Sequence, residues 1–205
     1  MKVKICGIQT FEHARAAEKA GADALGFMFA ESKRRISTVK AKQIISKLDD
    51  ESWKVGVFVN EKAGTVKNIA RYCGLSAIQL HGEEQPIDYV EVGLPIIKSI
   101  GISSTQTEID VKQVQYADYI LLDTEAQAYK GGNGVPFEWE KARDLGLRFP
   151  NIILAGGLNS ENIGKAISIV HPFMVDVSSG VEMNGRKNTR KIFEFIKIAK
   201  EGAML

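Results

Sequence analysis

Residues 119–123 read Tyr119-Ile120-Leu121-Leu122-Asp123, and their pattern of apolar and polar residues indicates the fold. A short apolar run that ends in a polar residue is typical of a strand buried on both faces of a parallel sheet. Runs of this kind recur along the whole chain and give eight expected strands: Val3–Cys6, Ala24–Phe29, Lys54–Val59, Ala77–Leu80, Ile96–Ile100, Tyr119–Asp123, Ile152–Ala155 and Phe173–Val177.

Amphipathic segments with a helical period separate these strands. The expected helices are Phe11–Ala20, Val39–Leu48, Ala63–Tyr72, Pro86–Val92, Gln106–Gln115, Glu138–Leu145, Asn159–Val170 and Thr189–Lys200. Residues that suit helix ends stand at their borders: Thr10, Ser37, Ser104 and Asn159 as N-caps, and Gly21 and Gly74 as C-caps.

Eight strand-helix units without a linker predict an α/β fold, a single-domain (β/α)8 TIM barrel formed by residues 1–205. The structural alternative is an open flavodoxin-like or Rossmann sheet, which has five or six strands and usually a phosphate-binding loop after the first strand. Residues Cys6-Gly7-Ile8-Gln9-Thr10 do not form such a loop. The barrel is therefore favoured.

The composition, 44% hydrophobic and 25% charged, is that of an ordinary globular protein, and the formal net charge of +2 is far below the basic excess of nucleic-acid-binding proteins. No apolar stretch approaches the ~20 residues of a membrane span, and two cysteines make no disulfide framework. We expect a cytoplasmic protein that acts on small anions. His81 has no second ligand at metal spacing, so no metal site is expected.

Two reactive side chains end expected strands. Cys6 closes the first strand and Asp123 closes the sixth. The carboxyl ends of barrel strands meet at one face, so the thiol and the carboxyl group are expected at the same site. An isolated cysteine is more often a small buried hydrophobic residue. An acidic group at the end of an apolar strand is costly to bury unpaired, which favours proton transfer for Asp123.

Two glycine- and serine-containing turns follow the seventh and eighth strands. Gly156 and Gly157 lie in the first turn, and Ser179 and Gly180 lie in the second. Barrels often bind phosphate at this place through backbone N–H groups. One such turn alone would only indicate a tight bend, but two adjacent turns indicate a phosphate site.

Fixed positive charge follows the second strand in Lys33-Arg34-Arg35. Charge runs are usually solvated surface, but a guanidinium beside the mouth of the barrel suits a substrate carboxylate. Gly131-Gly132-Asn133-Gly134, after the sixth strand, is expected to act as a lid or to lie against the substrate.

Together these motifs resemble the phosphoribosylanthranilate isomerase family. The most specific segments are Lys4-Ile5-Cys6-Gly7-Ile8 at the start and Asp176-Val177-Ser178-Ser179-Gly180-Val181-Glu182 near the end, and the similarity covers nearly the whole chain. The resemblance implies a cofactor-independent enzyme of tryptophan biosynthesis that binds a phosphorylated sugar-anthranilate. It converts N-(5-phosphoribosyl)anthranilate into 1-(o-carboxyphenylamino)-1-deoxyribulose 5-phosphate. The sequence does not decide between a monomer and a homodimer.

The resemblance also assigns roles to residues. Asp123 resembles the general acid that protonates the ribose ring oxygen, and Cys6 the general base that removes the C2 proton. Arg34 would hold the anthranilate carboxylate. The phosphate would be bound by Gly156, Gly157, Ser179 and Gly180.

A thiolate beside a protonated carboxyl group inverts the ordinary order of pKa values, about 8.5 for Cys and 3.9 for Asp. The inversion corresponds to roughly 6 kcal/mol. Burial of Asp123 and positive charge near Cys6 are expected to offset it, unless the productive state is a minority species.

Two other functions fit the same barrel. A sugar-phosphate epimerase or an indole-forming relative would need metal-binding histidines or a lysine and glutamate pair in place of Cys6. A non-catalytic barrel that binds a phosphorylated metabolite would keep the phosphate site without the acid and base. The presence of both Cys6 and Asp123 argues against the non-catalytic barrel.

Overall fold

The structure, a computed structural model, describes residues 1–102, 109–124 and 137–202. Eight parallel strands form a closed barrel in sequence order, and β1 pairs with β8 to close it. Their bounds are β1 Lys2–Cys6, β2 Ala24–Met28, β3 Trp53–Phe58, β4 Ala77–Leu80, β5 Ile96–Ile102, β6 Tyr119–Thr124, β7 Ile152–Ala155 and β8 Met174–Val177. The predicted (β/α)8 barrel is confirmed, and the open sheet is wrong.

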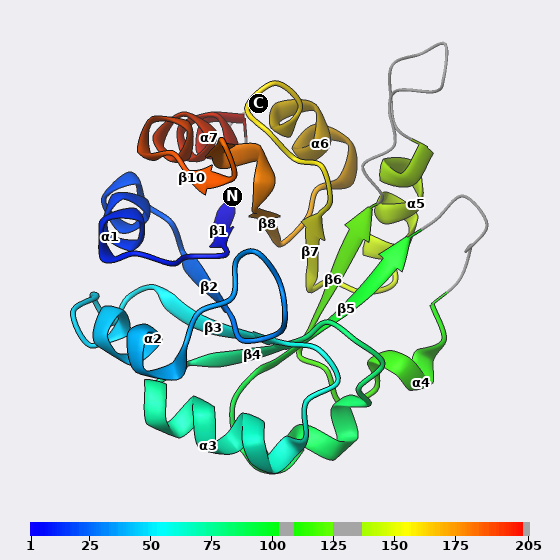
Figure 1. Ribbon diagram of the computed structural model, residues 1–205. Helices are drawn as coiled ribbons and strands as arrows, with labels where there is room; N and C mark the ends of the chain where they lie inside the picture. The colour runs from blue at the N-terminus through cyan, green and yellow to red at the C-terminus, as the bar shows by residue number, and fades with distance from the viewer. Residues whose placement is uncertain (103–108, 125–136, 203–205) are drawn as a thin grey trace.

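Helices surround the barrel (Figure 1). They are α1 Phe11–Ala20, α2 Thr38–Ile45, α3 Ala63–Cys73, η1 Pro86–Val92, α4 Val111–Val114, α5 Phe137–Gly146, α6 Ile163–Val170 and α7 Thr189–Glu201. Thr10 and Ser37 accept backbone hydrogen bonds as N-caps, and Gly21 and Gly74 end their helices in the left-handed conformation. These four predicted caps are confirmed. The N-cap predicted at Ser104 lies outside the described residues.

Three elements differ from the expected helices. Of the helix expected at Gln106–Gln115, only Val111–Val114 is helical among the described residues 109–115, and the side chain of Asp110 caps it. Residues Pro86–Val92 form a 3₁₀ helix rather than an α-helix, and the β-branched residues of this run lower its α-helical propensity. α6 begins at Ile163 and not at Asn159. The side chain of Asn159 instead accepts hydrogen bonds from the backbone N–H groups of Glu161 and Asn162, which makes a turn before the helix.

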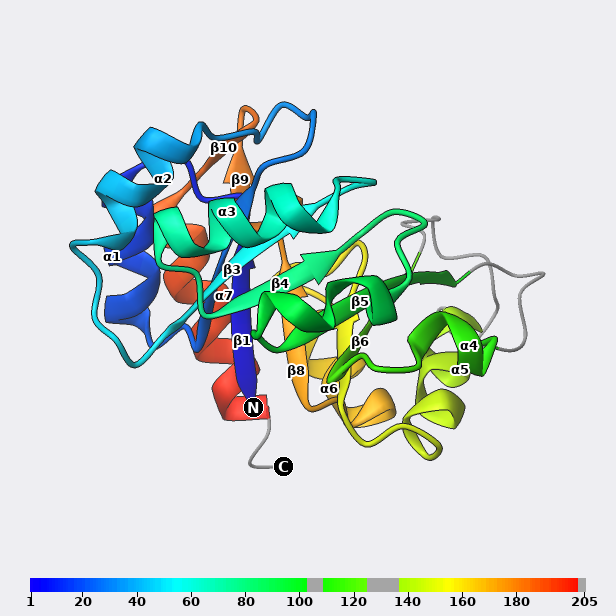
Figure 2. The same ribbon diagram turned by 90° about the horizontal axis from the view of Figure 1, so that it is seen from below.

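Three short elements complete the chain. η2 Ser179–Val181 follows β8, and β9 Glu182–Met183 pairs with β10 Arg186–Lys187 as a two-stranded antiparallel sheet. In Figure 2 this small sheet lies beyond the carboxyl end of β1, opposite the N-terminus. It therefore stands on the side of the barrel where the loops after the strands gather.

The interior of the barrel changes from apolar to polar along its axis. Its buried apolar cluster comprises Ala24, Val55, Ala77, Ile97, Leu121, Ile153, Ala155 and Met174. Lys4, Gln79 and Asp176 are also buried, and hydrogen bonds join them. Each stands near the carboxyl end of its strand, two residues before Cys6, His81 or Ser178, and an offset of two residues places the members of each pair on the same face. We call these three residues the polar layer.

Within the described ranges, no helix has the length and apolar character needed to cross a membrane.

Candidate active site

A cavity of about 230 Å³ opens at the carboxyl ends of the strands. It is lined by six of the seven residues that the sequence singled out: Cys6, Arg34, Asp123, Gly156, Gly157 and Ser179. Cys6 and Asp123 come from β1 and β6, which are separated by β7 and β8 around the barrel. The fold therefore brings the thiol and the carboxyl group to one cavity.

Cys6 occupies a gap that a glycine leaves. Cys6 pairs with Gly26 of β2, and a Cβ atom at Gly26 would lie 2.7 Å from the Cys6 sulfur. The sulfur is largely buried, because the residue is 6% exposed. Gly26 thus provides the space in which the thiol lies. No motif in the sequence indicated this role for Gly26.

Burial and charge act on the Cys6 thiol in opposite directions. Burial raises the pKa of Cys6, and nearby Asp176 raises it further, whereas the ammonium groups of Lys4 and Lys187 favour the thiolate. The expected positive charge near Cys6 is therefore present, but burial has the larger effect and the pKa stays above its ordinary value.

Asp123 is more open than expected. Its side chain is 42% exposed, and its Oδ2 atom lies 3.5 Å from Nε2 of His81. The expected burial of Asp123 is therefore not found, because the cavity buries the thiol and leaves the carboxyl group at its open side.

Arg34 is held by a carboxylate of the protein. Its Nε and Nη2 atoms donate to the two carboxylate oxygens of Glu182, at 2.6 and 3.0 Å. Burial opposes the charge of Glu182, but hydrogen bonds from Arg34 and Lys187 outweigh it and lower its pKa to about 2. Gly7 lies against Arg34, because a Cβ atom there would be 2.6 Å from the arginine Cδ.

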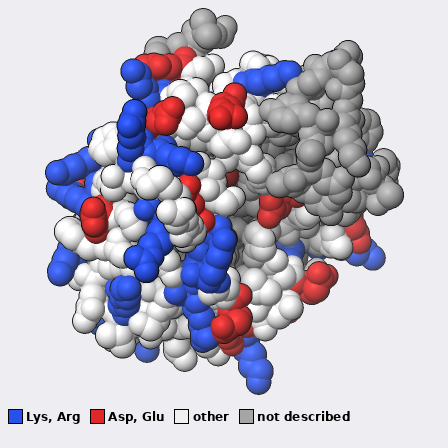
Figure 3. Space-filling model, turned by 45° about the horizontal axis from the view of Figure 1, so that its top comes forward, with Lys and Arg blue, Asp and Glu red and all other residues white. Residues whose placement is uncertain are grey.

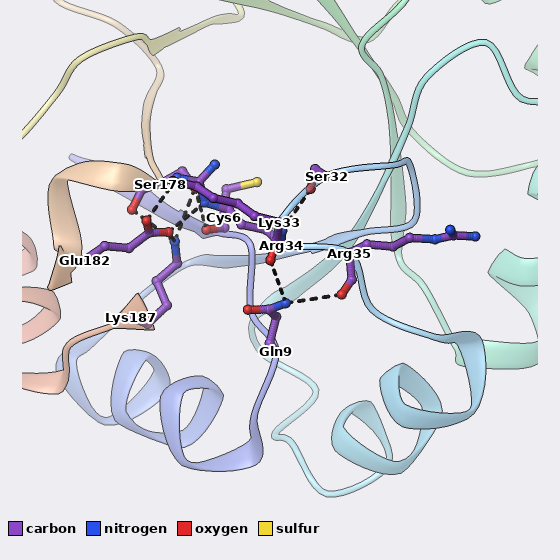
Figure 4. A network of polar contacts seen from close by, with 9 residues as sticks. All are labelled: Cys6, Gln9, Ser32, Lys33, Arg34, Arg35, Ser178, Glu182 and Lys187. Carbon is purple, nitrogen blue, oxygen red and sulfur yellow. Dashed lines mark hydrogen bonds and ion pairs between the residues drawn. The ribbon is translucent and has the colours of Figure 1, made fainter. Parts of the chain in front are cut away.

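Lys187 continues this network toward the backbone of Cys6 (Figure 4). Its Nζ donates to Glu182 and to both the backbone oxygen and the hydroxyl group of Ser178. The Ser178 hydroxyl in turn donates to the backbone oxygen of Cys6. A continuous set of polar contacts thus joins Arg34 to the strand end that carries Cys6.

The two turns after β7 and β8 lie against each other. Gly156 and Gly157 have φ values of 86° and 60°, the left-handed conformation that glycine adopts without strain. A Cβ atom at Gly180 would lie 1.9 Å from the backbone oxygen of Leu158. Gly180 therefore serves the close approach of the turns, and it is the one predicted site residue that does not line the cavity.

Sequence reasoning missed four residues of this region: Gln79, Asp176, Glu182 and Lys187. Gln79 and Asp176 line the cavity. The signal available in the sequence was a polar residue inside an otherwise apolar strand, two positions before His81 and Ser178. Lys187 gave no such signal, since its partners depend on how the β9 and β10 strands fold back.

Positive charge is unevenly distributed over the surface. On the face shown in Figure 3, Lys and Arg side chains gather on the side away from the grey residues. Such a distribution attracts a small anion to the mouth of the cavity.

No group of three metal-ligating side chains is present in the part of the chain that the structure describes. The glycine loop Gly131–Gly134 lies outside that part.

Known proteins share this architecture. Residues 3–198 match the family model for N-(5'-phosphoribosyl)anthranilate (PRA) isomerase. An N-(5'-phosphoribosyl)anthranilate isomerase from Bacillus cereus is 49% identical over 202 residues, which cover 97% of this chain and 98% of the relative.

Two solved structures are similar over 98% of this chain and 99% of theirs, each at 39% identity. One is a phosphoribosyl anthranilate isomerase in complex with reduced 1-(o-carboxyphenylamino)-1-deoxyribulose 5-phosphate, with a TM-score of 0.82. The other shows monomers of the dimeric phosphoribosylanthranilate isomerase from Thermotoga maritima, with a TM-score of 0.84. The chain belongs to the N-(5'-phosphoribosyl)anthranilate isomerase family.

Proposed function

We propose that this chain catalyses the isomerisation of N-(5-phosphoribosyl)anthranilate to 1-(o-carboxyphenylamino)-1-deoxyribulose 5-phosphate, a step of tryptophan biosynthesis. The observation that carries the proposal is the meeting of Cys6 and Asp123 in one cavity at the carboxyl end of the barrel, in a chain of this family. Family membership leaves no support for the epimerase or the indole-forming alternative.

Asp123 acts first, as the general acid. Its carboxyl proton passes to the ribose ring oxygen, the bond from C1 to that oxygen breaks, and the nitrogen lone pair forms the C1–N double bond of a Schiff base. Its exposed position at the open side of the cavity suits contact with the sugar ring.

Cys6 acts second, as the general base. Its thiolate removes the C2 proton, the electrons of that bond form a C1–C2 double bond, and the nitrogen regains its lone pair to give an enolamine. Tautomerisation of the enolamine yields the ketone. The lysines at positions 4 and 187 favour the thiolate that this step needs.

The two ends of the substrate are held at opposite parts of the cavity. We assign the phosphate to the turns of Gly156, Gly157, Ser179 and Gly180, with Gly180 contributing through the close packing of the turns. Arg34 holds the anthranilate carboxylate. Because Glu182 accepts from Nε and Nη2, we assign the carboxylate to the Nη1 donors of Arg34.

The reaction needs Cys6 as a thiolate and Asp123 as a protonated acid. This combination is a minority species in the free protein, because burial raises the pKa of the Cys6 thiol. We propose that the bound substrate shields Asp123 from water and so favours its protonated form.

The test is direct turnover: the protein is mixed with N-(5-phosphoribosyl)anthranilate, and the fluorescence of the anthranilate group is followed. The proposal predicts enzyme-dependent loss of that fluorescence with formation of the ketose product. A folded protein that shows no turnover but still binds reduced 1-(o-carboxyphenylamino)-1-deoxyribulose 5-phosphate, the reduced product analogue, would support the non-catalytic barrel instead.

A second experiment tests the carboxylate contact. Arg34→Ala is expected to weaken binding of the reduced product analogue in a salt-dependent way, because a charge-assisted contact is lost. Arg35→Ala is the matched control, since the Arg35 side chain is exposed and pairs with Glu31 on the surface. An unchanged dissociation constant in Arg34→Ala would remove the assigned contact.

A cytoplasmic location, a monomeric or homodimeric assembly and a single domain are also part of the proposal. The location follows from the chemistry, because the free thiols of Cys6 and Cys73 persist best in a reducing compartment.

A further inference from the structure

The polar layer beneath the cavity contains charge that the proposed reaction does not use directly. Lys4 is fully buried, and its Nζ lies 2.8 Å from Oδ2 of Asp176. The interior of a (β/α)8 barrel is usually filled by branched apolar side chains. A buried ion pair often adds no stability over apolar residues of the same size, so its place under the reactive groups calls for another role.

Lys4 fixes the orientation of the Gln79 amide group. The Nζ of Lys4 donates to Oε1 of Gln79 at 2.9 Å. An ammonium group has only donors, so the atom of Gln79 that faces it must be the oxygen. The reversed amide would direct two donors at each other in a fully buried place. The Gln79 NH2 group must therefore point away from Lys4.

The oriented NH2 group then fixes the proton on His81. One hydrogen bond runs from Nε2 of Gln79 to the Ser99 hydroxyl oxygen at 3.1 Å, and the other contact is to Nδ1 of His81 at 3.0 Å. Both hydrogens of the amide are thus used, and Nδ1 must offer a lone pair. A neutral imidazole with a lone pair on Nδ1 carries its proton on Nε2.

Nε2 of His81 is the atom that faces Asp123, 3.5 Å from Oδ2. We propose that Gln79, oriented by Lys4, is a positioning residue that holds His81 as a neutral Nε2–H donor toward Oδ2 of Asp123. Oδ1 is then left to carry the proton that the acid step delivers. The inference rests on the proposed function for its catalytic consequence, but not for the tautomer of His81.

The distance of 3.5 Å is longer than a hydrogen bond. Catalytic hydrogen bonds are often long before the substrate binds and shorten in the complex. A charged imidazolium at this place would hold Asp123 as a carboxylate and oppose its role as an acid. Because Nδ1 accepts from Gln79, the proton of His81 lies on Nε2, the atom that faces Asp123.

The first test needs no variant. Protein labelled with ¹⁵N in histidine is studied by long-range ¹H–¹⁵N correlation at neutral pH, and the signals of His81 are assigned as those missing in His81→Asn. The expected result is a protonated Nε2 and an unprotonated Nδ1. A proton on Nδ1, in either the other neutral tautomer or the cation, would overturn the inference.

The second test is Gln79→Glu, which replaces the NH2 donor with an acceptor of nearly the same shape. We expect Nδ1 of His81 to become protonated and kcat to fall by about 10- to 100-fold, with KM within about twofold. Ser99→Ala is the matched control, because it removes the other acceptor of the same NH2 group and leaves the His81 contact in place; its kcat should stay within about twofold of the wild type.

Two results of this variant would count against the inference. One is an unprotonated Nδ1 in Gln79→Glu, and the other is a wild-type kcat despite a protonated Nδ1. The two hypotheses fail separately: absence of turnover in the wild-type protein refutes the proposed function, whereas the tautomer of His81 is measured without substrate.

Discussion

Replacing Glu182 with glutamine removes the anion that lies between Arg34 and Lys187. Glu182 accepts from Arg34 at 2.6 and 3.0 Å and from Lys187 at 2.6 Å. Its pKa falls from 4.5 to about 2 in the folded protein, which at 1.36 kcal/mol per pH unit corresponds to about 3 kcal/mol. Solvent near Arg34 screens part of this, so Glu182→Gln should destabilise the protein by about 2 kcal/mol at pH 7.

The pH dependence gives the prediction its sign. A carboxyl group whose pKa is lowered by folding stabilises the folded state above its ordinary pKa, and this contribution is lost as the pH falls toward the folded value. The stability difference between wild type and Glu182→Gln should therefore be full at pH 7 and shrink between pH 4.5 and about 2.

The assay is urea unfolding at pH 7, 5, 4 and 3. Glu194→Gln on α7 is the control, because it makes the same chemical change at an exposed position and should alter stability by no more than about 0.5 kcal/mol. Equal stability of wild type and Glu182→Gln at pH 7, or a difference of the same size at pH 3, would refute the electrostatic reasoning.

Three further changes test other contacts. Gly26→Ala should displace the Cys6 sulfur, because the added Cβ would lie 2.7 Å from it, and kcat should fall by at least about 100-fold while far-ultraviolet circular dichroism stays unchanged; normal turnover would contradict this packing. Lys4→Met should destabilise the protein by about 3 to 5 kcal/mol in urea unfolding, because it leaves Asp176 buried without its partner; adding Asp176→Asn should restore much of the loss, and no restoration would argue against the ion pair. In a Cys73→Ala background, alkylation of Cys6 should rise at higher pH than that of a free thiol, because burial raises its pKa; a rise at lower pH would mean that the two lysines outweigh burial.

Much of the barrel follows from local sequence, because each strand carries its own signal. The run Tyr119–Asp123 falls within β6, and Ile152–Ala155 has the predicted bounds. Helix ends were predictable where a side chain caps its own helix, as at Thr10. Asn159 was harder to place, because the same side chain can cap a helix or form a turn before it.

Other parts of the site depend on contacts between distant segments. The space for the Cys6 sulfur exists because the register places Gly26 beside it. Arg34 meets Glu182 across 148 positions of sequence, and no local pattern encodes that pairing. The resemblance gave Cys6 and Asp123 their roles. Only the fold reveals that the thiol of Cys6 is buried while the carboxyl group of Asp123 is partly exposed.

The central claim is that Cys6 and Asp123 act in turn on one substrate in one cavity. It is tested most directly by measuring kcat for N-(5-phosphoribosyl)anthranilate in wild type, Cys6→Ser, Asp123→Asn and the double variant. Each single change should lower kcat by about 10²- to 10⁴-fold, and the double variant should be about as slow as the slower single variant, because the slower of two successive steps sets the rate. Full activity in either single variant, or losses that multiply in the double variant, would contradict the account.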